Sequence, residues 1–208
     1  MPENKYFNTV ESESHFEIKI QHSIFISHLK SVDSFEEAKK YISKINTDYK
    51  DATHNCWAYI IGDSAQDFHS SDAGEPSGTA GKPILNTLQK YKMTNIVAVV
   101  TRYYGGTKLG VRGLIDAYSK STEECIINSR LKVLIQIQKY KLKVPYDFFE
   151  TVKYNLKNYN AQILDIEYSE SISFLIQIEK DFSQDLTIYL TELQNTNKIY
   201  FEILQDSY

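Results

Sequence analysis

The chain lacks the residues that small disulfide-stapled or zinc-stapled proteins depend on. Its two cysteines, Cys56 and Cys125, are too few for a disulfide framework or a cysteine zinc site. The longest aliphatic run, Ile96–Val100, is far below the roughly 20 residues that span a membrane. The first residues also show no signal-peptide pattern. We therefore expect a reduced, cytoplasmic protein with no membrane association.

An overall excess of positive charge is missing as well. The formal net charge is -4, which argues against a generally cationic nucleic-acid binder. The charge is uneven, however, because residues 82–130 carry eight Lys and Arg but only three Asp and Glu. A local positive region can capture an anion even when the whole chain is negative, since salt screens each charge over roughly 8 Å.

Glycine is scarce, and nearly all of it is concentrated in two places. Of eight glycines, all but Gly62 lie within residues 71–83 and 101–113. Glycine adopts positive φ and lets other groups approach the backbone, so this concentration predicts a site built from two loops. Neither loop is a Walker A motif, because Pro76 and Pro83 stand where that motif needs glycine and Ser or Thr. A Rossmann glycine motif is not present either.

The first 130 residues are predicted to form one mixed domain. Period-two alternation and apolar runs predict strands over residues 16–20, 23–30, 55–61, 67–70 and 96–100. Helices are predicted after Ser34 and over residues 79–91 and 110–128. Ser34 is expected to cap the first helix. At the start of the second helix, two interpretations compete for the same N–H groups: capping by Ser77 and Thr79, or binding of a phosphate or carboxylate. The run at 96–100 is expected to be a central strand.

Residues 131–208 are predicted to form a second, smaller domain. A single alternating strand over 131–144 ends at Pro145 and is followed by a helix, two strands, a second helix and a final strand. This βαββαβ order is the ferredoxin-like plan. The fold class is therefore α+β, with domains 1–130 and 131–208.

Three blocks of sequence resemble the signature of the IMPACT family, in its bacterial YigZ-like branch. They are His54-Asn55-Cys56-Trp57-Ala58-Tyr59, the ten residues from Gly74 to Pro83, and the ten from Thr101 to Gly110. The resemblance implies a first domain with the fold of ribosomal protein S5 domain 2, also found in domain IV of elongation factor G. It implies a second domain similar to domain V of that factor.

The resemblance also bears on function. Eukaryotic relatives modulate translation, whereas the bacterial branch has no settled biochemical activity, so RNA or ribosome binding is an expectation from fold analogy. The sequence departs from the family pattern at Ala73, where a second aspartate is usual, and at Arg112 and Asp116. The lost carboxylate argues against a metal site, and no cofactor is expected.

The leading hypothesis is a translation-associated protein that recognises phosphate or RNA in a cleft between the two glycine-rich loops. The residues expected to bind the anion are Lys82, Arg102, Tyr103, Gly105, Gly106, Lys108, Gly110 and Arg112. The residues expected to shape the loops are Gly74, Pro76, Ser77, Gly78, Thr79 and Gly81. For Arg102 an equal alternative is an ion pair with Asp72 or Glu75 that locks the loops together.

Other interpretations stay open. Tyr103 and Tyr104 either stack on bases or cover glycine backbone. A stripe formed by Lys139, Lys141 and Lys143 is either a solvated face or an RNA contact.

Two further functions compete with the leading one. In the first, a hydrolase of small anionic substrates uses His54, Asp72 and Glu75 as acid–base groups. In the second, the chain is a protein-interaction adaptor. A nucleophilic pair of Cys56 with His54 is conceivable, but a buried structural cysteine is favoured.

Overall fold

The computed structural model describes residues 7–62 and 65–204, which form an α+β protein of two compact units. This confirms the predicted fold class. The first unit is Phe7–Leu134, and the second contains the described residues from Ile135 onward. None of the helices in the described ranges is long and apolar enough to cross a membrane.

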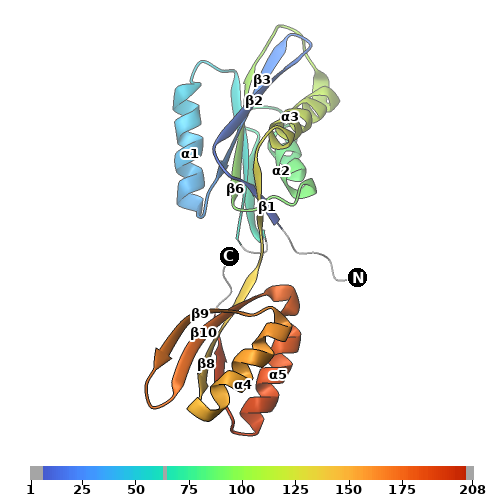
Figure 1. Cartoon of the computed structure of the whole chain (residues 1–208). Coiled ribbons are helices and arrows are strands. Elements are labelled where there is room, and N and C mark those ends of the chain that lie inside the picture. Colours follow the sequence, from blue (N-terminus) through green and yellow to red (C-terminus); the bar gives the residue numbers. More distant parts are fainter. Residues whose placement is uncertain (1–6, 63–64, 205–208) are drawn as a thin grey trace. The chain divides into compact units, whose positions relative to one another are not determined.

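The first unit is a five-stranded antiparallel sheet with helices on both faces. The strand order is β2 (Ser14–Ile20), β3 (Ser23–Ser31), β6 (Ile96–Tyr103), β4 (His54–Ile61) and β5 (Asp67–Ser71). Helix α1 (Phe35–Asp48) covers one face, while α2 (Gly81–Lys90) and α3 (Gly110–Ile127) cover the other (Figure 1). A separate two-stranded ribbon pairs β1 (Phe7–Val10) with β7 (Leu131–Leu134).

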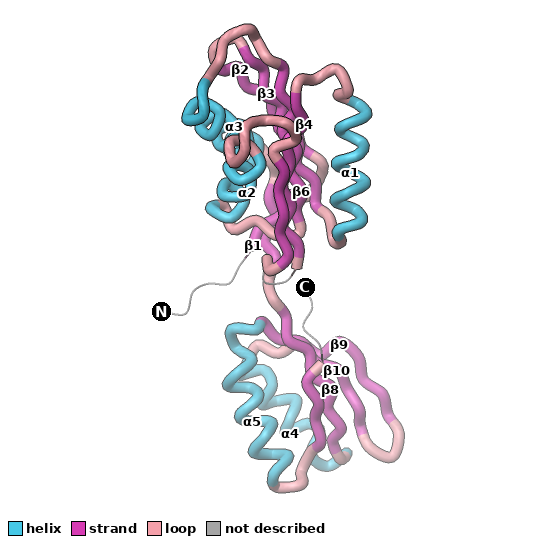
Figure 2. The backbone as a smooth tube through the Cα atoms, turned by 180° about the vertical axis from the view of Figure 1, so that it is seen from behind, coloured by secondary structure: helices cyan, strands magenta, loops and turns pink. Residues whose placement is uncertain are grey.

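The central strand β6 explains the apolar run at 96–100. Ile96, Ala98 and Val100 belong to the core beneath α2 and α3, whereas Val97 and Val99 belong to the core beneath α1. A strand buried on both faces has no polar side to alternate, so its sequence is continuously apolar. Figure 2 shows this sheet between its two helical layers. The prediction of a central strand here is confirmed.

Helix α1 begins as predicted from its first residues. The Ser34 side chain accepts a hydrogen bond from the Glu37 N–H at 3.3 Å, so Ser34 is the N-cap. Glu36 and Glu37 lie in the first turn, where the helix dipole favours negative charge.

The second unit has the predicted βαββαβ order. Its sheet runs β11 (Tyr200–Ile203), β8 (Ile137–Val144), β10 (Ile172–Glu179) and β9 (Gln162–Tyr168). Helices α4 (Tyr146–Leu156) and α5 (Ser183–Asn195) lie together on one face (Figure 1).

The single strand predicted over 131–144 is wrong, because it is two strands with different partners. Residues Leu131–Leu134 pair with β1, and β8 starts only at Ile137. Between them the Gln136 carbonyl accepts a hydrogen bond from the Lys180 N–H. The apolar positions change phase in this stretch, from odd numbers up to Ile137 to even numbers from Tyr140. A single strand would keep one phase, so this shift was the sequence signal of the break.

His28 on β3 generates a prediction about stability and pH. The side chain is only 4% exposed and packs against the Tyr49 ring at 4.8 Å. Burial lowers the pKa of His28 to about 4, and the nearby positive charge of His15 acts in the same direction. Between pH 6.5 and about 4 the unfolded chain therefore binds a proton that the native chain does not. Stability is present above this window and is lost as the pH falls through it.

We expect the free energy of unfolding to fall by about 2–3 kcal/mol between pH 7 and pH 4.5 through this group. Urea unfolding at several pH values measures the effect. His28→Gln, which cannot titrate, should remove this part of the pH dependence. An identical pH dependence in the variant and the parent chain would contradict the assignment.

Candidate functional site

The carboxylate of Asp72, at the end of β5, caps helix α2. Its Oδ1 accepts hydrogen bonds from the N–H groups of Ala80 and Gly81 at 3.0 and 2.8 Å, and its Oδ2 from that of Gly78 at 2.8 Å. The interpretation in which Ser77 and Thr79 cap this helix is wrong. The Thr79 hydroxyl donates instead to the Pro76 carbonyl at 2.6 Å, and no side chain of the N-cap residue itself contributes.

This capping determines the charge at the start of α2. Partial burial would raise the pKa of Asp72, but the three backbone donors outweigh it and the pKa is lowered. The carboxylate therefore stays ionised and occupies the N–H groups that an external anion would need. The start of α2 is thus an internally satisfied anion site, and it is not available to a phosphate.

Two glycines of the site are required by close contacts. A Cβ on Gly81 would lie 2.7 Å from backbone atoms of Ser71, so glycine lets α2 start against the end of β5. A Cβ on Gly105 would overlap the backbone carbonyl of His22. These contacts fix both loops against the sheet.

A buried ion pair joins the two glycine-rich segments. Arg102, near the end of β6, donates from Nη1 to Oε1 of Glu75 at 2.6 Å, and the two side chains are 6% and 3% exposed. The Tyr118 hydroxyl, from α3, donates to the same oxygen at 2.8 Å. Of the two alternatives for Arg102, the structure has the ion pair that locks the loops.

The guanidinium of Arg102 is not fully satisfied. Its carbon Cζ lies 5.5 Å from the ring centres of both Phe25 and Tyr104, so the cation is flanked by two aromatic rings. Its Nε is buried and has no hydrogen-bond partner among the described residues. A buried donor without a partner is unusual and points to a group that the protein itself does not supply.

The two segments line a common cleft of about 390 Å³ within the first unit. Its lining comes from the start of β4, the loop after β5, the end of β6 and the first turns of α3. The residues are Thr53, His54, Glu75, Pro76, Arg102, Tyr104, Lys108, Leu109, Gly110, Val111 and Leu114. Four of them, Pro76, Leu109, Val111 and Leu114, are aliphatic, and the one carboxylate among them, Glu75, is already paired.

Helix α3 starts at this cleft without a cap. Its N-cap residue Leu109 makes no side-chain capping bond, and its first turn holds no acidic residue. Gly110 has φ +72°, a left-handed conformation that favours glycine. The first-turn N–H groups therefore have no capping side chain, in contrast to those of α2, and they are suited to an anion.

The other predicted binding residues are distributed differently. Lys82 is exposed on α2 and does not line the cleft. Arg112 pairs with Asp116 at 3.2 Å on the surface, and the Tyr103 hydroxyl donates to Asp51 at 3.2 Å. Of the predicted set, the cleft brings together Arg102, Lys108 and Gly110.

The cleft is also lined by Leu109, Val111 and Leu114, which are not among the predicted site residues. Their apolar character next to the glycine loop was the available signal.

The proposed hydrolase residues do not form an acid–base trio. His54 Nδ1 donates to the Ala73 carbonyl at 3.0 Å, Asp72 caps α2, and Glu75 pairs with Arg102. Burial raises the pKa of the Cys56 thiol to about 12, so it is not a thiolate nucleophile. His54 and Glu75 do line the cleft, but Asp72 does not. These contacts favour structural roles for the three residues.

The lysine stripe of the second unit is flanked by acidic residues. Lys139, Lys141 and Lys143 alternate with buried Tyr140, Leu142 and Val144, so they lie on the face of the sheet away from the core. Lys141 is directly opposite Glu202 on β11, and Asp165 and Glu167 lie on the same sheet. This mixture of charges favours a solvated face over an RNA backbone contact.

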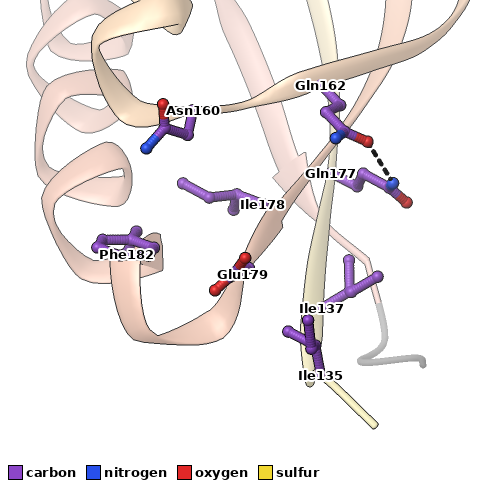
Figure 3. A pocket seen from close by; sticks show the side chains of 8 residues that line it. All are labelled: Ile135, Ile137, Asn160, Gln162, Gln177, Ile178, Glu179 and Phe182. Carbon is purple, nitrogen blue, oxygen red and sulfur yellow. Dashed lines mark hydrogen bonds between the residues drawn. The ribbon is translucent and has the colours of Figure 1, made fainter. Parts of the chain in front are cut away.

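A smaller hollow of about 200 Å³ lies in the second unit. Figure 3 shows the Gln177 amide donating to Gln162 at 2.9 Å, beside the apolar side chains of Ile135, Ile137 and Ile178. No basic residue is among the described residues that line it. The hollow is therefore unsuited to phosphate, and the cleft of the first unit is the stronger anion site.

Comparisons with known proteins cover both units. Residues 21–126 match the Impact N-terminal domain, and residues 142–195 match a domain of unknown function, DUF1949. The chain is 37% identical over 192 residues to the IMPACT family member YvyE of Bacillus subtilis, covering 92% of this chain and 88% of that protein. It is 34% identical over 152 residues to YigZ of Escherichia coli, covering 72% and 74% respectively.

The fold also matches a solved structure. A crystal structure of a hypothetical protein aligns with a TM-score of 0.61 and 27% identity, covering 96% of both chains. The match extends through both units.

The cap of α2 is tested by removing the Asp72 carboxylate. We expect Asp72→Ala to lower the free energy of unfolding by about 1–2 kcal/mol at pH 7, because three backbone donors lose their acceptor. Since the pKa of Asp72 is lowered, this contribution is complete above about pH 4 and is lost as the pH falls through the lowered value. Urea unfolding measures it, with Ser77→Ala as the matched control. If Ser77→Ala lowered the free energy of unfolding as much as Asp72→Ala does, Ser77 and not Asp72 alone would be the cap of α2.

The buried ion pair is tested by a double-mutant cycle. Arg102→Met alone should cost about 3–5 kcal/mol, because it leaves the Glu75 carboxylate buried without its cation. Arg102→Met combined with Glu75→Gln should recover part of this loss, since the amide carries no charge and still accepts from Tyr118. Urea unfolding of the four proteins gives the coupling energy. Strictly additive costs would show that the pair does not hold the loops.

Proposed function

The chain belongs to the IMPACT family, and from this premise we propose that it is a translation-associated binding protein that recognises the phosphate groups of RNA. The binding site is the cleft of the first unit. The link to translation rests on the resemblance to eukaryotic members of the family and to domains of ribosomal protein S5 and elongation factor G. The proposed place of action is therefore on or near the ribosome.

One observation carries the proposal of phosphate binding. The uncapped start of α3 and the exposed Lys108 line the same cleft as Arg102, whose buried Nε–H has no partner among the described residues. Helix N-termini and lysine are common phosphate ligands, and their combination attracts an anionic phosphodiester more strongly than either does alone. Among the described residues that line the cleft, the one carboxylate, Glu75, is paired with Arg102, so none of these residues adds an unpaired negative charge that would repel an anion.

The proposal is tested by the salt dependence of RNA binding. Fluorescence anisotropy with a labelled single-stranded RNA should show affinity that falls as salt rises, because each neutralised phosphate releases counterions. Lys108→Ala should weaken binding and reduce the slope of log K against log salt by about 0.7, the share of one phosphate contact on a single strand.

Lys82→Ala is the matched control. Like Lys108, Lys82 is an exposed lysine in a glycine-rich segment near a helix start, but it lies outside the cleft. It should leave both affinity and slope unchanged. Equal effects of the two variants on RNA binding would contradict the assignment of the cleft as the binding site. Co-sedimentation of the same two variants with ribosomes tests the proposed place of action.

A further inference from the structure

We infer that the cleft holds one unpaired nucleotide of a single strand, with its base stacked on Tyr104 and its phosphate at the start of α3. The inference rests on the proposed function and specifies the ligand of that same cleft. It makes Tyr104 the residue that selects unpaired over paired RNA.

Tyr104 is held in place as a stacking platform. Its backbone N–H donates a hydrogen bond to the Thr53 hydroxyl at 2.9 Å, and this bond holds the backbone at Tyr104 in place. One region of the ring contacts the Arg102 guanidinium, whose Cζ lies 5.5 Å from the ring centre. The ring nevertheless lines the cleft and is 45% exposed. A fixed aromatic ring with an open surface offers a base a partner at little cost in conformational entropy.

The Tyr104 ring is the outermost of three groups in contact, of which the other two are the Arg102 guanidinium and the buried Phe25 ring. The Arg102 guanidinium lies at 5.5 Å from the ring centres of both Phe25 and Tyr104, and Phe25 is fully buried. A base on the exposed part of Tyr104 would extend this series by one member. It would also further cover the buried Arg102–Glu75 pair from water, which strengthens the electrostatic attraction within the pair.

The rest of the cleft suits the two ends of a nucleotide. Pro76, Leu109 and Val111 supply apolar surface for the base and sugar, and free phosphate would not need it. Lys108 and the uncapped first turn of α3 supply the phosphate end. The volume of about 390 Å³ is in the range of small-ligand sites.

This arrangement excludes base-paired RNA as the preferred ligand. In a duplex each base is stacked between its neighbours, so its face is not available to a side chain. A single strand can turn one base out onto Tyr104 without breaking pairs. Preference for single strands therefore follows from stacking and does not need base-specific hydrogen bonds.

The inference is tested by anisotropy with one labelled RNA, measured alone and annealed to its complement. The single strand should bind more tightly than the duplex at the same salt. Tyr104→Leu keeps apolar bulk over Arg102 but removes the aromatic face, so it should weaken single-strand binding roughly 5- to 150-fold, the equivalent of one stacked base. The salt slope should stay unchanged, because a stacking contact releases no counterions.

Two controls accompany this variant. Tyr104→Phe should bind like the parent chain, because it keeps the ring. Tyr103→Leu should also bind like the parent chain, because the Tyr103 hydroxyl bonds to Asp51 and the residue does not line the cleft. Thermal unfolding of all three variants confirms that they fold.

The outcomes separate this inference from the proposed function. Single-strand binding that depends on Lys108 but not on Tyr104, or equal binding of duplex and single strand, overturns the stacked nucleotide and leaves phosphate recognition standing. Absence of salt-dependent binding to either RNA overturns both.

Discussion

The geometry of the first unit's site depends on one buried ion pair. Arg102 comes from the central strand β6, Glu75 from the loop between β5 and α2, and Tyr118 from α3, so the pair and its third partner join three elements. Burying two charges is costly, and the cost is offset only where hydrogen bonds surround them. Here the Tyr118 hydroxyl donates a hydrogen bond to Glu75. The rings of Phe25 and Tyr104 contact the Arg102 guanidinium by cation–π interactions. The pair therefore links the two glycine-rich loops directly, in addition to the contacts that each makes with the sheet.

The two helices next to these loops differ in whether a side chain caps their first turn. Helix α2 receives the Asp72 carboxylate, while α3 receives no capping side chain. An uncapped helix start costs stability, because its N–H groups lack acceptors. A bound ligand that supplies the missing acceptor offsets this cost. Helix α3 is the helix whose start lines the cleft. Of the eight basic residues in 82–130, the cleft contains Lys108 and Arg102, and Arg102 is paired with Glu75.

The sequence predicted those features that depend on neighbouring residues. The Ser34 cap, the buried run of β6 and the βαββαβ order each follow from local pattern, and the structure confirms them. The cap of α2 was missed because its acceptor, Asp72, is supplied from the end of β5 across a turn, whereas the nearer hydroxyls fit the local rule. The break before β8 was missed although the apolar positions change phase there, since the partner of β7 is the first strand of the chain. The pairing of Arg102 stayed open because a sequence does not give the distance between two loops.

Tyr104 connects the structural and the binding roles of the loops. Its ring covers the Arg102 guanidinium and also lines the cleft. A ligand stacked on this ring would add to the layer that keeps water from the ion pair, so ligand binding and the integrity of the loops would favour each other. By mass action, a ligand that binds only the folded loops also stabilises the fold. The interaction that builds the cleft would thus be strengthened by the nucleotide that the cleft is proposed to hold.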